Sequence, residues 1–362
     1  MKQGLVGRRS EGLFRYQGWP TVAKDENGVL YAVCSGHRLG HICPFGKNFM
    51  YVSYDEGETW SSPILVNDTA LDDRDAGILP LGNGKLLLTW FNHPPKFYRD
   101  NELHIKQKNI KENLHPLFDG MLQTWENLPC DRVKSGSFIR ISEDGGKSWG
   151  SAIQVPVSSP HGPTILQDGT LLYLGKENFG ESNHDADIGA YSSADGGKTW
   201  NFCGKVPIPE GIKTDNFYEP HAVQLRNGRI LGAIRAQGEW VEFGFTIYLT
   251  TSDDNGKTWS VPQPLHICGS PPHLLLHSSG AVILTYGRRK APFGEMARIS
   301  YDNGETWGDE IALNDSGLNS DLGYPSTAEL SDGSLITVYY QRLPDDDVCS
   351  ILYTKWSIEE TK

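Results

Sequence analysis

An eight-residue pattern, S-x-D-x-G-x-[S/T]-W, occurs five times along the chain and constrains its fold more than any other feature. The copies begin at Ser53, Ser142, Ser193, Ser252 and Ser300. In each copy the Asp can hydrogen-bond the backbone of a tight turn, the Gly can adopt positive φ, and the Trp can close the turn onto a sheet. The ligand series of a calcium loop is absent. We therefore interpret these five boxes as scaffold and not as functional sites.

A second unit alternates with the boxes and consists of two apolar runs joined by a turn that ends in glycine. The turn glycines are Gly28, Gly84, Gly169, Gly228, Gly280 and Gly333. Each unit is typical of a β-hairpin. Pairs of hairpins repeating every 40–60 residues or so predict an all-β fold, a six-bladed β-propeller that residues 1–362 form as one domain. The sixth blade lacks a box, so its outer strand is expected at 351–356 or at the N-terminus.

The longest interval between turn glycines, from Gly84 to Gly169, indicates an insertion in blade two at about residues 92–134. Apolar side chains recur there at helical spacing, at Ile110, Leu114, Leu117, Met121, Trp125 and Leu128. We expect one or two short amphipathic helices. They either pack on the outside of blade two or form a lid or a contact within a homo-oligomer.

Charge and composition exclude several classes of partner. The net charge of −12 argues against nucleic acid and anionic membranes, which both require a basic surface. No apolar stretch has the length of a membrane span, and no signal peptide is visible, so we expect a cytoplasmic protein, or a secreted one if a leader has been removed. The six cysteines are scattered without C-x-x-C spacing, which favours free thiols, and we expect no cofactor and no metal.

Aligning the hairpins on their turn glycines reveals titratable residues where the inner strands begin. Nine residues before the glycine stand Trp19, Asp75, Pro160, Glu219, Pro271 and Tyr324. His161 stands eight residues before its glycine, and His221 and His273 stand seven before theirs. Inner strands of a propeller begin at one mouth of its channel. Polar residues that differ between blades therefore indicate a shared pocket at that mouth.

The boxes, the six predicted blades and the segment Tyr218-Glu219-Pro220-His221, followed by Asn227-Gly-Arg229 and Ile234-Arg235, resemble the sialidase (neuraminidase) superfamily. The resemblance covers nearly the whole chain outside the insertion. It implies an exo-glycosidase that hydrolyses a terminal α-linked sialic acid or a related acidic sugar with retention, and so a glycan as partner. Sialidases use a tyrosine nucleophile. The resemblance gives this role to Tyr324, with Glu219 as the base that takes its proton.

The resemblance also implies three arginines that bind the substrate carboxylate, since guanidinium offers it paired hydrogen bonds. Arg235 matches the second of them, and Arg289 the third, with Arg288 as its rival. The sequence departs from the family pattern at the first of the three arginines, for which Arg38 and Arg74 are the candidates.

A second departure concerns the general acid, because the loop at 35–48 contains no carboxylate. Asp75 and His41 are the candidates for this role. We expect His161, His221 and His273 to bind substrate hydroxyls or to exchange protons. Two other functions stay open: a glycosidase or lyase that acts on another acidic glycan through histidines, and a carbohydrate-binding propeller without catalysis.

Overall fold

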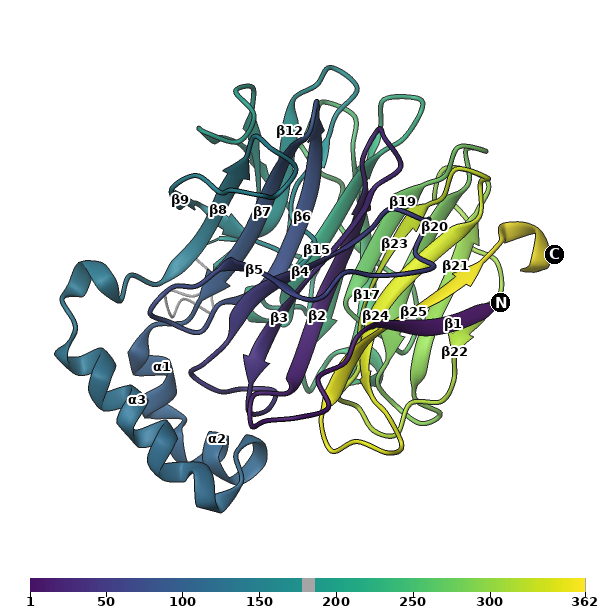
Figure 1. The fold of residues 1–362 in the computed structure, drawn as a ribbon. Coiled ribbons are helices and arrows are strands. Elements are labelled where there is room, and N and C mark those ends of the chain that lie inside the picture. The colour runs from purple at the N-terminus through teal and green to yellow at the C-terminus, as the bar shows by residue number, and fades with distance from the viewer. Residues whose placement is uncertain (178–185, 362) are drawn as a thin grey trace.

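Six sheets surround a central channel in the computed structural model, which describes residues 1–177 and 186–361 (Figure 1). The six-bladed β-propeller predicted from the sequence is thereby confirmed. From the inside outwards, blade one contains β2 (Tyr16–Lys24), β3 (Leu30–Arg38), β4 (Lys47–Ser53) and β5 (Ile64–Asn67), and blade two contains β6 (Arg74–Gly82), β7 (Lys85–Asn92), β8 (Gly136–Ser142) and β9 (Ile153–Val155).

Blades three to five continue this arrangement. Blade three contains β10 (Val157–Ser158), β11 (Thr164–Ile165), β12 (Leu171–Glu177), β13 (Ile188–Ser193) and β14 (Asn201–Lys205), blade four contains β15 (Phe217–Gln224), β16 (Ile230–Gln237), β17 (Phe245–Ser252) and β18 (Gln263–Pro264), and blade five contains β19 (Pro272–Leu276), β20 (Val282–Arg288), β21 (Gly294–Ser300) and β22 (Ile311–Asn314). Outside the sheets and the insertion, the described residues also form the short 3₁₀ turns η3 (Thr214–Asn216), η4 (Glu242–Gly244) and η5 (Ile358–Thr361).

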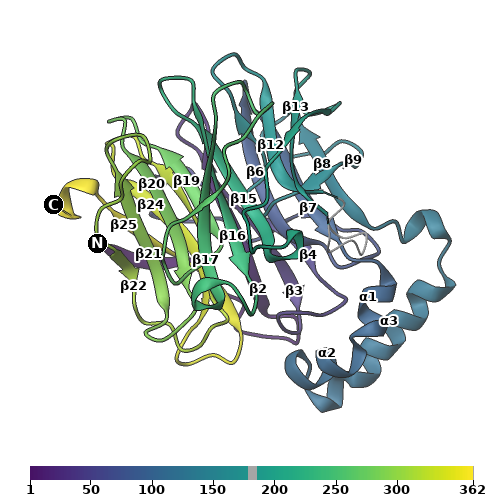
Figure 2. The same ribbon diagram turned by 180° about the vertical axis from the view of Figure 1, so that it is seen from behind.

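The sixth blade takes strands from both ends of the chain and closes the ring. It contains β23 (Gly323–Glu329), β24 (Leu335–Arg342), β25 (Cys349–Trp356) and, outermost, β1 (Lys2–Gly7). Both candidates for its outer part are thus present, because β25 pairs antiparallel with the N-terminal β1. The two chain ends consequently lie on the same side of the molecule (Figures 1 and 2).

The hydrophobic core lies between the blades and not in one central layer. Leu30 of blade one packs with Ile336 of blade six, and Val33 of blade one packs with Leu88 of blade two. A blade is therefore covered on both faces, which explains why its strands are buried in nearly every position, as β24 illustrates.

The boxes have the scaffold role expected of them. In the first box, Gly57 N–H donates to Ser53 Oγ at 2.8 Å, and Asp55 accepts from the Thr59 N–H at 2.9 Å and from its hydroxyl at 2.6 Å. The other four boxes repeat these bonds. The Asp carboxylates are thus engaged within their own turns.

The insertion is helical, as predicted, but it contains three α-helices where one or two were expected. Its elements are α1 (Pro95–Asp100), α2 (Glu102–Asn109), η1 (Glu112–Leu114), α3 (His115–Asn127) and η2 (Cys130–Arg132). These helices lie at one end of the propeller, beside the ends of β3 and β7 (Figures 1 and 2). Phe118 and Trp125 of α3 pack with Cys43 and Leu71, which belong to loops of blades one and two. Of the alternatives left open, packing against blade two alone does not hold, because the apolar face of α3 is buried against loops of both blades one and two. A role as a lid or as a contact in a homo-oligomer stays a prediction.

Two further expectations concern single features of the chain. All six cysteines are unpaired, in agreement with the prediction of free thiols. Within the described residues, no helix has both the length and the apolar character of a membrane span.

Candidate active site

Four of the six inner strands begin with the same backbone distortion. Trp19, Asp75, Glu219 and Tyr324 have φ values of 54°, 45°, 44° and 51°. At each of them the pairing of the inner strand with its neighbour shifts register. Bulky residues held at positive φ cost about 1–3 kcal/mol each, and such strain is concentrated at functional sites. A bulge also redirects side chains, and here it brings these four residues to one mouth of the channel.

The residues of blades four and six in this column form a hydrogen-bonded pair. The Tyr324 hydroxyl donates to Glu219 Oε1 at 2.5 Å. Arg235 Nη1 donates to Glu219 Oε2 at 2.5 Å and lies 3.1 Å from the Tyr324 hydroxyl. Burial is the main cause that raises the pKa of Tyr324 well above its usual value, and the negative charge of Glu219 is the second. The phenol therefore keeps its proton at rest, and a carboxylate that can accept this proton is already in contact with it.

Arg289 approaches the same tyrosine from blade five. Its guanidinium carbon lies 5.5 Å from the centre of the Tyr324 ring. Its Nε donates to Ser270 O at 3.1 Å, whereas its buried Nη2 has no hydrogen-bond partner among the described residues. The rival Arg288 instead forms an ion pair with Glu310 at 2.5 Å. The geometry thus favours Arg289 as the arginine near the reacting centre.

The two candidates for the first arginine lie together beside Trp19. The guanidinium carbons of Arg38 and Arg74 are 4.7 and 4.4 Å from the centre of the Trp19 ring. Arg38 is fully buried and is held by both carboxylate oxygens of Asp72, at 2.5 and 3.0 Å. In the described part of the chain, the Nε atoms of both arginines lack a hydrogen-bond partner, but Arg74 is 7% exposed and its Nη1 lies 3.5 Å from Asp72 Oδ2, so it is held less tightly. Of the two, Arg74 is the better placed to meet a ligand.

Asp75, a candidate acid, is buried in blade two. It is 5% exposed, and its Oδ1 accepts no hydrogen bond from the described residues. Burial, with the neighbouring Glu219 charge adding to it, raises the pKa of Asp75 to about 7. A carboxyl group that retains its proton near neutral pH has the property required of a general acid.

The other candidate acid, His41, is oriented by a carboxylate that the sequence analysis did not single out. His41 Nδ1 lies 2.8 Å from Asp321 Oδ1, and the Tyr16 hydroxyl donates to the same oxygen at 2.9 Å. Burial lowers the pKa of His41. Asp321 stands three residues before Tyr324, and this closeness was its only signal in the sequence.

His161, His221 and His273 lie further along the inner strands than the residues at the channel mouth, and their rings contact one another. Their ring centres are 4.5–5.6 Å apart. His221 Nδ1 accepts the Leu274 N–H at 3.0 Å, and His273 Nδ1 accepts the Thr327 N–H at 3.3 Å, so these two rings join neighbouring blades. Together with His161 they line a cavity of about 410 Å³ formed by the later parts of the inner strands. Among the described residues, no group of three or more His, Cys, Asp or Glu is arranged to hold a metal ion.

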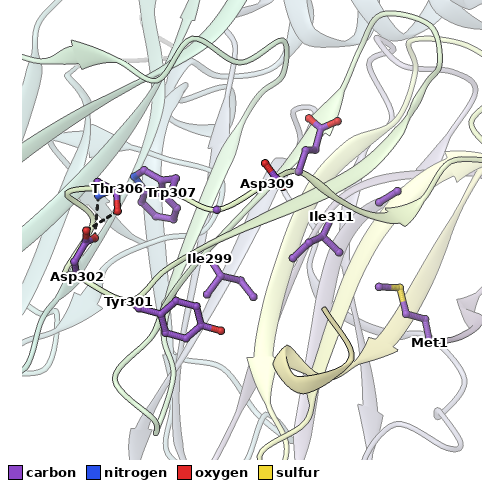
Figure 3. A pocket seen from close by; sticks show the side chains of 11 residues that line it. Met1, Ile299, Tyr301, Asp302, Thr306, Trp307, Asp309 and Ile311 are labelled. Atoms are coloured by element: carbon purple, nitrogen blue, oxygen red, sulfur yellow. Dashed lines mark hydrogen bonds between the residues drawn. The ribbon is translucent and has the colours of Figure 1, made fainter. Parts of the chain in front are cut away.

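A cavity of about 750 Å³ lies elsewhere, at the perimeter of blade five (Figure 3). It is lined by residues of the fifth box, including Tyr301, Asp302 and Trp307, together with Met1. The Asp302 carboxylate is already bound by the N–H and the hydroxyl of Thr306, as the dashed lines in Figure 3 show. This carboxylate of the box is therefore engaged in its own turn and is not available to a ligand in the cavity.

A propeller with five boxes and with a tyrosine, a glutamate and arginines at its channel mouth has the architecture of the sialidase-type propellers. The profile of the BNR repeat-like domain family matches residues 163–345, half of the chain, and the protein belongs to that family. A sialidase of Paraclostridium sordellii is 27% identical over 177 residues, in a match that covers 39% of this chain and 43% of that protein. The chain thus spans less than half the length of this relative.

Solved structures show the same fold. A protein of unknown function from Dyadobacter fermentans superposes with a TM-score of 0.78 at 22% identity, and the match covers 98% of each chain. The NanB sialidase of Streptococcus pneumoniae superposes with a TM-score of 0.71 at 15% identity, over 99% of this chain and 71% of that one. A leech intramolecular trans-sialidase gives a TM-score of 0.70 at 16% identity, over 99% and 71%.

Proposed function

We propose that this protein is a retaining exo-glycosidase that removes a terminal α-linked sialic acid or a related acidic sugar. The observation that carries the proposal is the contact between the Tyr324 hydroxyl and Glu219, with Arg235 bound to both. The sialidase of Paraclostridium sordellii supports the same class of substrate.

In the first chemical step, Tyr324 attacks the anomeric carbon while Glu219 accepts the phenolic proton. A phenol with a raised pKa is a weak nucleophile unless a base removes its proton in the transition state. A neutral tyrosine also avoids the repulsion that a carboxylate nucleophile would meet from the carboxylate of the sugar. The glycosyl–tyrosine bond that forms is then hydrolysed by water, which restores the phenol.

The acidic group of the sugar is bound by Arg74, Arg235 and Arg289. Each of these guanidinium groups has a buried nitrogen without a hydrogen-bond partner among the described residues. Such nitrogens are costly unless a ligand supplies an acceptor, and a carboxylate supplies two.

Asp75 donates the proton that the leaving oxygen needs. With a pKa of about 7, it is largely protonated below neutrality and loses its proton above it. The rate on a natural glycoside, which depends on this proton, should therefore fall as the pH rises above about 7. His41, which is oriented by Asp321, is the alternative donor. The comparison of two substrates with Asp75→Ala, described in the Discussion, separates the two candidates.

Hydrolysis of a fluorogenic sialoside by the purified protein tests the proposal. We expect turnover in the wild type and its loss in Tyr324→Phe, which lacks only the hydroxyl. Turnover that survives in Tyr324→Phe would contradict the nucleophile, and wild-type protein that cleaves no sialoside would contradict the substrate class.

The Tyr16–His41–Asp321 cluster favours a second candidate, a lyase or glycosidase that acts on another acidic glycan. An imidazole oriented by a carboxylate is suited to abstract a proton next to a uronate carboxylate. A panel of uronate-containing oligosaccharides tests this function, because a lyase leaves an unsaturated product that absorbs ultraviolet light. Binding without any product would instead indicate a carbohydrate-binding propeller.

A further inference from the structure

Asp72 is the centre of a buried ionic cluster between the helical insertion and the channel mouth. We call Asp72, Arg38, Arg74 and Tyr98 the Asp72 cluster. Arg38, Asp72 and Tyr98 are all 0% exposed. The Asp72 carboxylate receives Arg38 on both oxygens, and its Oδ2 also accepts the Tyr98 hydroxyl at 2.5 Å. The cluster contains two arginines and one carboxylate, so it retains positive charge.

Arg74 is the least tightly held member of the Asp72 cluster. Its Nη1 lies 3.5 Å from Asp72 Oδ2, the oxygen to which Tyr98 and Arg38 already donate. Its other polar contact is with the carbonyl oxygen of His41 at 3.4 Å. Because Asp72 Oδ2 is occupied by closer donors, Arg74 remains over the Trp19 ring instead of moving fully onto the carboxylate.

The insertion supplies the donor that keeps Oδ2 occupied. Tyr98 belongs to α1, which packs in one apolar cluster with Leu71, Phe118 and Trp125. Trp125 Nε1 also donates to the carbonyl oxygen of Ala70 at 2.6 Å. The insertion therefore fixes the short segment that carries Asp72 and leads directly into Arg74 and β6.

We propose that Tyr98 is a positioning residue, which keeps Arg74 available for the carboxylate of the substrate by occupying Asp72 Oδ2. This role rests on the proposed function, because it assumes that Arg74 binds an acidic sugar. Without the Tyr98 hydroxyl, Oδ2 has a free lone pair, and Arg74 moves toward it and away from the ligand. The insertion then acts as a brace for the binding site and not as a lid.

The test compares the wild type with Tyr98→Phe and with a matched control, Tyr31→Phe. Tyr31 is also buried and donates to a carboxylate, Asp25 Oδ2, at 3.2 Å, but this carboxylate lies in the turn before Gly28 at the other end of blade one. The probes are the 2,3-unsaturated derivative of N-acetylneuraminic acid and its methyl ester, measured by calorimetry.

We expect Tyr98→Phe to weaken binding of the acid roughly tenfold, as the loss of one hydrogen bond to a charged group does. Binding of the ester should change little, because the ester lacks the charge that Arg74 recognises. Tyr31→Phe should change neither. The positioning role would be overturned if Tyr98→Phe lost as much affinity for the ester as for the acid. It would also be overturned if Tyr31→Phe lost as much affinity for the acid as Tyr98→Phe does.

A second measurement separates this inference from the proposed function. Crystal structures of the ligand-free wild type and both variants should show Arg74 displaced toward Asp72 in Tyr98→Phe alone. If Arg74 moves but the wild type binds no acidic sugar, the positioning geometry is supported and the proposed substrate is wrong. If Arg74 stays in place in Tyr98→Phe, the positioning role is wrong whatever the wild type binds.

Discussion

The buried histidines of the channel predict that acid weakens the fold in a defined range of pH. Burial lowers the pKa of His221 from 6.5 to about 4. The unfolded chain thus takes up a proton near pH 6.5, whereas the folded chain does so only near pH 4. His221 therefore adds stability that is complete above pH 6.5 and is lost as the pH falls to about 4. Because proton uptake by His221 is linked to unfolding, the free energy of unfolding falls by about 2.5 kcal/mol between about pH 7 and about pH 4.5.

The variant His221→Gln isolates this contribution. A glutamine Oε1 can accept the Leu274 N–H that His221 Nδ1 now accepts, and it does not titrate. Urea unfolding of wild type and variant at the two pH values gives two differences in the free energy of unfolding. We expect the wild type to lose about 2.5 kcal/mol more than His221→Gln on acidification.

The exposed His266, which pairs with Glu242 at the surface, provides the control His266→Gln. Acidification should weaken this variant as much as it weakens the wild type. If His221→Gln and the wild type lose equal stability, His221 is protonated as readily in the folded chain as in the unfolded one, and the reasoning from burial is refuted.

Four further variants test the site and the scaffold. Arg235→Lys keeps the charge but loses the paired hydrogen bonds, so kcat/KM on a sialoside should fall roughly 10- to 100-fold. Values of kcat/KM near wild type in both Arg235→Lys and Arg289→Lys would contradict an acidic substrate. Asp75→Ala should slow a natural sialoside far more than an activated aryl one, which leaves without a proton; equal losses would reassign Asp75 to binding and give the acid role to His41. Trp259 is the buried tryptophan of the fourth box, so Trp259→Ala should lower the free energy of unfolding, measured in urea, by about 3–5 kcal/mol. A variant that loses turnover while its stability is unchanged would contradict the scaffold role of Trp259.

The repeat explains why the central residues could be predicted from the sequence. Equivalent positions of a propeller blade occupy equivalent places around the axis, so alignment on the turn glycines was sufficient to bring Glu219 and Tyr324 to the same mouth. Their contact in the structure follows from that symmetry. Asp75 lies in the same column and carries the same backbone distortion.

The parts of the site that escaped prediction lie outside the repeat. Asp72 and Asp321 stand in loops before inner strands, and Tyr98 stands in the insertion, so no equivalent blade reveals their positions. The positive φ of Trp19 could not be predicted either, because a tryptophan has no local preference for that conformation and only the packing around it imposes the strain.

The most direct test of the central claim is to trap the intermediate with a fluorinated sialosyl donor and to locate it by peptide mass spectrometry. Fluorine slows both chemical steps, and a good leaving group restores the first, so the covalent enzyme accumulates. We predict that the peptide containing Tyr324 gains the mass of one fluorinated sugar in the wild type and not in Tyr324→Phe. An adduct on another residue, or turnover of the donor with no adduct at all, would contradict a Tyr324 nucleophile activated by Glu219.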